Sequence, residues 1–434
     1  MPTVVISPFI LLLPLAALAW YSRRWALLVL LASLSAYIIR GSVFGLPTTW
    51  LELGIYLTLV VWLVKGDWRV WQEIKLSALQ GWLVPLALWL AASVVGILVA
   101  GDLRLALGVW KGFIIDPLIL SLMVATVALA DKSGTTWWRN VIAALLVGAA
   151  ATTLVAFLQS WLLQADRLQS GYDSPNVLAM YLSPILVASV LWYLSQRGRA
   201  SLTLGWRVLW LAGCMVTAAG VFLTNSYTAL VAVAGAWLVA LLVHQRPKLA
   251  IAAGAAMVLA GLLGPLVAVS LNYSFFKGHT NVTYGTTSAE VRLTMWRQAV
   301  VEISARPVFG LGLGQWQPTF LAMAREQGLL SIRQPGLAIE LYHSSLYPHN
   351  LWLTTWLATG GLGLIALIWL ALKVFQTARR TDALMPAAVL TVQMLHGALD
   401  TPFWKNDLAV LWWLAVAAAI IWQQRTQLQT EHTL

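Results

Sequence analysis

The sequence predicts an all-α, polytopic integral membrane protein with about 12–13 transmembrane helices. Of its 434 residues, 60% are hydrophobic and only 10% are charged, whereas a soluble domain is closer to half apolar and a quarter charged. Runs of roughly 20 apolar residues, the length that a helix needs to cross a bilayer, recur along the whole chain. Many of the 25 tryptophans stand at the ends of these runs, where their amphipathic rings suit the headgroup level of a membrane.

The individual runs support this count. The first, residues 4–20, lacks the basic flank and the small-residue cleavage site of a signal peptide, so we expect it to be retained as a helix. The second, residues 26–39, is short, and the count is therefore 12 or 13. Several later runs are nearly free of charge, and these are residues 82–100, 141–163, 249–270 and 351–372.

The distribution of Lys and Arg predicts the orientation. Most of the 27 Lys and Arg residues fall in one set of short loops, which alternates with a second, less basic set. Positive loops stay in the cytoplasm, so the first set and the C-terminus are predicted to be cytoplasmic. The basic set is residues 21–24, 65–75, 131–139, 196–207, 244–248, 373–382 and the tail after residue 422, and the outer set is 40–49, 101–104, 164–175, 224–227 and 400–407. The net charge of +11 is therefore a topology signal, and we expect no nucleic-acid partner.

One connection on the outer side is much longer than the rest. About 80 residues between 270 and 349 contain no spanning run, and structureless loops of that length are uncommon unless they are functional. Within it, Thr287-Ser-Ala-Glu290 reads as a capping box that begins a helix ending near Arg306. A glycine-rich turn, residues 310–314, and a second helical stretch, residues 320–327, follow. We expect one membrane domain, residues 1–434, with an extracytoplasmic loop, residues 271–348, inserted in it.

Several classes of chemistry are disfavoured. The glycine-rich turn lacks the Gly-Lys-Ser/Thr ending of a nucleotide-binding loop. The sequence has no His-Glu-x-x-His pattern and no nucleophile elbow, and His343 and His349 form only a weak metal pattern. We therefore expect neither a metal nor a cofactor. The single cysteine, Cys214, excludes an intramolecular disulfide.

The strongest catalytic candidate is His349, which opens a membrane helix at the end of the long loop. Pro348 presets the start of that helix, and Asn350 follows the histidine. An imidazole can accept a proton from a hydroxyl at physiological pH. The alternative is that His349 serves only as a helix N-cap or an interfacial residue.

Basic side chains supply candidate anion contacts. Arg292 and Arg297 stand on the predicted outer helix, and a guanidinium binds phosphate oxygens with a forked pair of donors. A solvated or headgroup-facing role is the alternative for each. Lys111 and Asp116 lie inside an apolar run, where an ionisable residue suggests function. Lys111 could instead extend its ammonium group toward the nearby outer surface.

The ordered set of motifs resembles the O-antigen ligase and O-antigen polymerase superfamily. The resemblance covers residues 174–407 and, more loosely, the whole chain. It rests first on three motifs of the long loop: Glu290-x-Arg292-x-x-x-Trp296, Arg306-Pro-Val-Phe-Gly-Leu-Gly-Leu-Gly314, and Pro348-His349-Asn350 before a helix containing Gly360-Gly361-x-Gly363. It is supported by Ser174-Pro175-Asn176, Thr224-x-Ser226 and Asp400-Thr401-Pro402, each at the start of a predicted helix.

This resemblance implies a GT-C-like, multi-pass glycosyltransferase of the bacterial inner membrane, with its active site on the periplasmic side. Such an enzyme transfers glycan from an undecaprenyl-diphosphate carrier to an acceptor hydroxyl, without a metal and with inversion. An O-antigen ligase acting in lipopolysaccharide or surface polysaccharide biosynthesis, with lipid A-core as acceptor, is the favoured form, and a repeat-unit polymerase is the alternative. By resemblance His349 is a base or acceptor-positioning group, and Arg292 engages the diphosphate.

One residue departs from the family pattern. Many members carry arginine after the serine of the Thr-x-Ser motif, whereas this chain has Tyr227. We expect Lys111 or Arg297 to supply the missing cation. We count Asn176, Tyr227, Asn350 and Asp400 as further substrate contacts.

Functions of other classes stay open at this stage. A transporter or flippase of lipid-linked glycan would also be polytopic, but internal repeats, which mark many transporters, are not evident here. A structural or assembly protein would leave His349, Arg292 and Asn350 replaceable.

Overall fold

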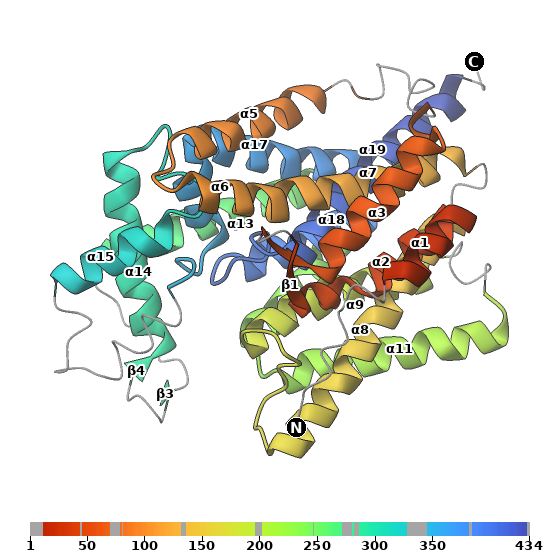
Figure 1. The fold of residues 1–434 in the computed structure, drawn as a ribbon, viewed down its shortest axis with the longest axis horizontal. Coiled ribbons are helices and arrows are strands. Elements are labelled where there is room, and N and C mark those ends of the chain that lie inside the picture. Colours follow the sequence, from red (N-terminus) through yellow and green to blue (C-terminus); the bar gives the residue numbers. More distant parts are fainter. Residues whose placement is uncertain are drawn as a thin grey trace.

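The structure is a computed structural model in which helices make up nearly all of the secondary structure (Figure 1). The described residues are 12–43, 46–69, 79, 81–131, 136–195, 202–245, 247–270, 280–281, 286–327, 345–381 and 384–431. His343 lies outside them.

The helices follow the apolar runs of the sequence. In the first half they are α1 (Leu12–Tyr21), α2 (Arg23–Ala32), the 3₁₀ turn η2 (Leu34–Ile38), α3 (Trp50–Val64), α5 (Leu83–Leu98), α6 (Leu103–Trp110), the π-helical turn η4 (Lys111–Ile115), α7 (Asp116–Ala130), α8 (Thr136–Leu163) and α9 (Pro175–Leu194). In the second half they are α11 (Leu204–Leu223), α12 (Tyr227–Gln245), α13 (Pro247–Ser270), α14 (Ser288–Ala305), α15 (Trp316–Glu326), α17 (Leu351–Thr381), α18 (Leu384–His396) and α19 (Asn406–Glu431).

Strands are minor. An antiparallel hairpin, β1 (Arg40–Val43) and β2 (Leu46–Thr49), pairs Arg40 with Thr49. A second short pair joins β3 (Thr280–Asn281) to β4 (Thr286–Thr287) just before α14.

The predicted all-α, polytopic membrane class is confirmed. Within the described residues, six helices are long and apolar enough to cross a membrane, and α6, η4 and α7 form one of them, from Leu103 to Ala130. Six shorter apolar helices of 10–17 residues accompany them. The count of 12–13 crossings stays a prediction, because a short helix crosses a bilayer only with help from its flanks.

One hydrophobic core gathers around α17, α18 and α19. Its centre holds Trp89 of α5 against Phe403, with ring centroids 5.4 Å apart and planes at 89°. Trp404 and Trp413 complete the same aromatic group. Edge-to-face rings are attractive because the positive edge of one ring meets the negative face of the other. This core fixes the segment between α18 and α19, which carries Asp400.

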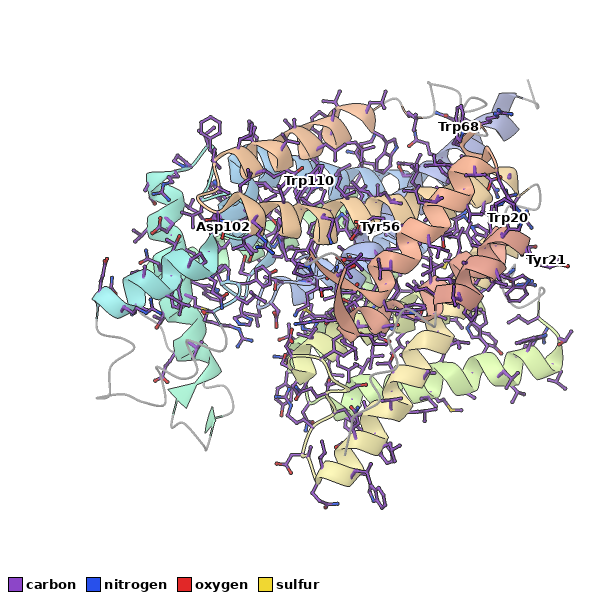
Figure 2. The ribbon with its side chains drawn as sticks, in the orientation of Figure 1. Trp20, Tyr21, Tyr56, Trp68, Asp102 and Trp110 are labelled. Carbon is purple, nitrogen blue, oxygen red and sulfur yellow. The ribbon has the colours of Figure 1, made fainter. Side chains whose placement is uncertain are left out.

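The loops of the two predicted sets gather at opposite ends of the bundle. Figure 2 shows Trp20, Tyr21 and Trp68 at one end and Asp102 toward the other. At the first end, Arg23 Nε lies 2.7 Å from a carboxylate oxygen of Asp67. We name this the Arg425 end, after the residue that ties the C-terminal helix to it.

The opposite end collects the less basic loops, and we name it the His349 end. There the loop after α8 contacts both the start of α12 and the loop before α19 through Arg167 and Lys405, and Asp102 binds the long loop through Gln315. For the loops joined by these contacts, the two ends agree with the two sets that the alternation of Lys and Arg predicts. Which end faces the periplasm stays a prediction.

The long loop contains the two helices that the sequence predicted. α14 begins at Ser288, within the predicted capping box, and ends at Ala305 before Arg306-Pro307. Met295 and Trp296 of α14 and Phe320 of α15 bury their side chains against Leu353 of α17. The described part of the loop is therefore docked on the membrane helices.

The glycine-rich turn explains how the loop docks so closely. Gly310 has a φ of 69°, a conformation that favours glycine. A Cβ atom placed there would lie 2.4 Å from the carbonyl oxygen of Leu357 in α17. The neighbouring Leu311 donates its amide to that same oxygen at 2.7 Å. A side chain at Gly310 would push the turn away from α17.

Candidate active site where the long loop re-enters the bundle

The site is built around His349, the last residue but one before α17. Its backbone has a φ of 50°, which is uncommon for a residue other than glycine. Such strained positions persist only where the surrounding structure holds them, and they often occur at functional sites.

Asn350 holds this turn. Its buried side chain accepts hydrogen bonds from the amides of Trp352, at 3.0 Å, and Leu353, at 2.9 Å. Its amide nitrogen donates to the carbonyl oxygens of Gly261 and Ala398, both at 2.9 Å. Asn350, rather than His349, thus caps the helix, so the N-cap alternative for His349 is excluded. These four bonds use the full capacity of the Asn350 side chain, and its predicted contact with substrate gains no support.

His349 pairs with Asp400. The Nδ1 atom of His349 lies 3.2 Å from Oδ1 of Asp400, whose buried carboxylate also accepts from the amide of Thr401 at 3.0 Å. A carboxylate can only accept, so we assign the proton to Nδ1. Nε2 is then left as the acceptor on a side chain that is 27% exposed. This is the arrangement in which a histidine can act as a general base toward a bound ligand.

The first turns of α14 lie against this pair. The Nε of Arg292 donates to the carbonyl oxygen of Leu399 at 3.0 Å, one residue before Asp400. The indole nitrogen of Trp296 donates to the carbonyl oxygen of Pro348 at 2.8 Å, one residue before His349. One helix therefore pins both backbone segments of the site and brings the Arg292 guanidinium to them.

The charges of the site are coupled. Burial raises the pKa of the Asp400 carboxyl, but His349, through its charge and hydrogen bond, and Arg292 outweigh burial and hold that pKa well below its usual range. Burial lowers the pKa of Arg292, and the charge of Asp400 partly offsets the effect. Asp400 is thus ionised and able to stabilise positive charge on the imidazole.

Two predicted cations lie differently. Arg297 is exposed on α14, and five residues along a helix place it about 140° around from Arg292. Lys111, in the π-helical turn η4, lies 3.0 Å from a buried carboxylate oxygen of Glu52. That oxygen also accepts from Thr48 at 2.8 Å. The charge of Lys111 is therefore matched by Glu52, and its role as substitute cation stays a prediction.

A cation that the sequence reasoning missed stands beside Asn176 and Tyr227. Arg167 donates from Nε to the carbonyl oxygen of Thr224 at 2.8 Å, and from Nη2 to the side chain of Asn176 and the carbonyl oxygen of Asn225, both at 3.3 Å. Arg167 is the only Lys or Arg in the loop of residues 164–175. A lone basic residue in an outer loop could have marked Arg167 as a candidate, but only the fold shows its partners.

The loop that carries Arg167 is tied to the segment that carries Asp400. Asp173 pairs with Lys405 at 2.5 Å, and the hydroxyl of Tyr172 donates to Asp407 at 3.0 Å. Burial, and after it the charge of Asp173, raise the pKa of Tyr347, so Asp173 is also close to the turn before His349. The loop of Arg167 and the segment of Asp400 are therefore joined by direct polar contacts.

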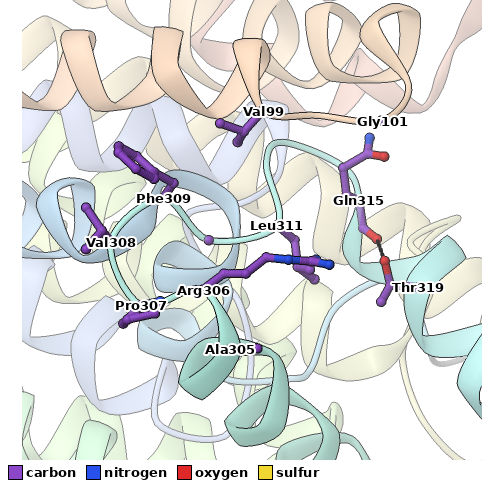
Figure 3. Close-up of a pocket in the computed structure, with 11 residues that line it drawn as sticks. Val99, Gly101, Ala305, Arg306, Pro307, Val308, Phe309, Leu311, Gln315 and Thr319 are labelled. Carbon is purple, nitrogen blue, oxygen red and sulfur yellow. Dashed lines mark hydrogen bonds between the residues drawn. The ribbon is translucent and has the colours of Figure 1, made fainter.

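A cavity of about 660 Å³ lies elsewhere on the long loop (Figure 3). Arg306, Phe309 and Gln315 line it, together with Gly101 from the turn before α6. The end of α14 is about 20 Å along the helix axis from Arg292 at 1.5 Å per residue. The cavity is therefore separate from the His349–Asp400 pair.

A metal ion has no evident site in the part of the chain that the structure describes. No group of three or more His, Cys, Asp or Glu residues there is arranged to hold one. The polar groups at the His349 end are instead paired cations, carboxylates and amides.

Comparison with known proteins bears on the family. A family model described as O-Antigen ligase matches residues 212–368. The matched segment contains Tyr227, Arg292, Arg297, His349 and Asn350. A comparison with curated proteins finds no match. The match confirms the resemblance of the chain, over residues 212–368, to the O-antigen ligase and O-antigen polymerase superfamily.

Proposed function

We propose that this protein is a glycosyltransferase that moves glycan from an undecaprenyl-diphosphate carrier to an acceptor hydroxyl at the outer face of the bacterial inner membrane. The observation that carries the proposal is the pair of His349 and Asp400 beside Arg292, placed where the long loop re-enters the bundle. We favour an O-antigen ligase-type enzyme of lipopolysaccharide or surface polysaccharide biosynthesis.

His349 acts as the base in this proposal. Its Nε2 accepts the proton of the acceptor hydroxyl while the oxygen attacks the anomeric carbon of the donor sugar. Asp400, bonded to Nδ1, stabilises the imidazolium that forms. The proton stays on His349 while the products form and then passes from the imidazolium to water.

The leaving group departs on the other side of the anomeric carbon. The bond from that carbon to the diphosphate oxygen breaks as the new bond forms, so a single displacement inverts the configuration. Arg292 stabilises the negative charge that develops on the leaving diphosphate. Its guanidinium is already held in place, so no reorganisation is needed as the reaction proceeds. Diphosphate is a good leaving group, and no metal is required in this scheme.

Reconstitution tests the proposal. The purified protein in liposomes is given an undecaprenyl-diphosphate-linked glycan and either lipid A-core or a second lipid-linked repeat unit. We expect release of undecaprenyl diphosphate together with a glycosylated acceptor. Transfer to lipid A-core identifies a ligase, and lengthening of the second repeat identifies a polymerase. Movement of the donor across the bilayer without release of diphosphate would instead show a transporter.

A further inference from the structure

We propose that Arg167 binds the diphosphate of the lipid-linked donor, and that it supplies the cation at the start of α12 where Tyr227 stands. The inference rests on the proposed function and names the residue that holds the donor. It differs from the sequence-based expectation, in which Lys111 or Arg297 filled this role.

The first argument is the way in which Arg167 is held. Its guanidinium makes three hydrogen bonds to oxygens of two different segments, Thr224 and Asn225 before α12 and Asn176 in the first turn of α9. These bonds use the Nε donor and both donors of Nη2, and they fix the plane of the group. The two donors of Nη1 remain, and within the described residues no hydrogen bond is made by them. A fixed guanidinium with donors to spare can form a charge-assisted hydrogen bond to a phosphate oxygen.

The second argument is charge. The three partners of Arg167 are neutral, whereas Arg23, Lys111 and Lys405 each pair with a carboxylate. Within the described residues, no ion pair involves Arg167. Burial lowers the pKa of its guanidinium, which shows that its surroundings do not fully compensate the charge. A fixed, partly buried cation of this kind is stabilised by an anion, and the described residues do not supply one in an ion pair.

The third argument is the surface around Arg167. The end of α8 exposes Trp161, Leu162 and Leu163 by 62–77%, and Phe222 at the end of α11 is 65% exposed. In a membrane protein such side chains face acyl chains. An anion bound at Arg167 would therefore lie beside lipid, where the diphosphate of a polyprenyl carrier lies when its tail stays in the bilayer.

The fourth argument is continuity with the transfer site. Asp173 and Tyr172, in the same loop as Arg167, bind Lys405 and Asp407. The segment that ends at Asp407 also carries Asp400, the partner of His349. The donor diphosphate and the base are thus held by one connected set of contacts.

Binding of undecaprenyl diphosphate without glycan tests this role apart from catalysis. The protein is placed in nanodiscs of neutral phosphatidylcholine, and the Kd of the probe is measured for wild type and Arg167→Gln. Loss of a charge-assisted contact weakens binding roughly 10- to 100-fold. Arg425→Gln is the matched control, because Arg425 also donates to backbone carbonyls but lies at the opposite end, and it should leave the Kd unchanged.

A double variant that moves the arginine from position 167 to position 227 distinguishes loss of the anion contact from a folding defect. Arg167→Gln combined with Tyr227→Arg should restore most of the affinity, because it returns a guanidinium to the same turn. Addition of phosphatidylglycerol, a lipid with a single phosphate, should displace the probe poorly. If phosphatidylglycerol competes fully and depends equally on Arg167, the site binds an anionic headgroup and the proposal is wrong.

The outcomes separate this inference from the proposed function. An unchanged Kd in Arg167→Gln would overturn the inference, even if the wild-type protein transfers glycan. If Arg167→Gln loses most of the probe binding but the wild-type protein transfers no glycan, the inference is upheld and the proposed function is overturned.

Discussion

Two half-buried arginines at opposite ends of the bundle make nearly the same contacts in different electrostatic surroundings. Arg425 donates to the carbonyl oxygens of Ala128 and Asp131, at 2.6 and 2.8 Å. Arg167 donates to those of Thr224 and Asn225. The negative charge of Asp131 favours the charged form of Arg425. Among the described residues, no carboxylate has this effect on Arg167. The first contact ties helices together, and the second holds a cation ready for a ligand.

The difference extends to the two ends as a whole. The Arg425 end has exposed or half-buried lysines that lie over tryptophan rings, such as Lys65 over Trp20 and Lys373 over Trp82. The His349 end instead buries carboxylates, with Glu52 5% and Asp400 5% exposed. Buried charge is costly unless it is paired, and its concentration at one end is typical of a functional site.

The largest expected effect concerns the side of the membrane on which each end lies. In a Cys214→Ser background, Gln327→Cys and Gln427→Cys place one thiol at an exposed glutamine near each end. In intact spheroplasts, a membrane-impermeant maleimide should label position 327 and leave position 427 unlabelled until the membrane is opened. The reverse labelling would place the His349 end in the cytoplasm and remove the basis for an outer-face enzyme.

The next effect is on turnover at His349. General-base catalysis contributes roughly 10²–10⁴-fold, so His349→Ala should lower the rate of glycan transfer by about that factor. Probe binding at Arg167 should hardly change, which separates the base from the anion contact. The glutamine of His349→Gln can form a hydrogen bond, but its amide cannot take up a proton near neutral pH. If the Gln variant keeps most of the activity, His349 positions the acceptor and is not a base.

A smaller effect is expected at Arg292. Arg292→Lys keeps the charge but loses the forked donors and the Nε bond to Leu399. We expect transfer to fall roughly 30- to 150-fold, as for the loss of a bidentate contact worth about 2–3 kcal/mol. Arg325→Lys, on the exposed side of α15, is the control and should retain wild-type transfer. Equal rates for both variants would mean that Arg292 only anchors α14.

The sequence predicted those features that arise from local patterns. The apolar runs, the capping box at Thr287 and the alternation of basic loops each depend on neighbours in the chain, and the structure confirms the helices. His349 and Arg292 were found in the same way, through motifs. The pairing of His349 with Asp400 joins residues 51 positions apart, and no periodicity encodes it.

The roles within the site were harder to predict. Asn350, expected to contact substrate, is consumed in capping α17. Lys111, expected to supply a cation, is paired with Glu52 of α3, which is 59 positions away in the chain. Arg167 was missed because its three partners come from two other segments. Charge balance depends on such contacts between distant parts of the chain, and a sequence pattern does not contain them.

The smallest effect on donor binding is expected at Lys111, and it separates the two candidate cations. Lys111→Met leaves the buried carboxylate of Glu52 without its ion-pair partner. We expect the free energy of unfolding to fall by roughly 1–3 kcal/mol, less than for a fully buried pair because the Lys111 side chain is 35% exposed. The double variant Lys111→Met/Glu52→Gln should recover most of this stability, since no unpaired charge remains. The Kd for undecaprenyl diphosphate should stay within about threefold of wild type in both variants. A tenfold loss of binding that the double variant does not repair would make Lys111 the substitute cation, as the sequence alone suggested, and would leave Arg167 a structural tie like Arg425.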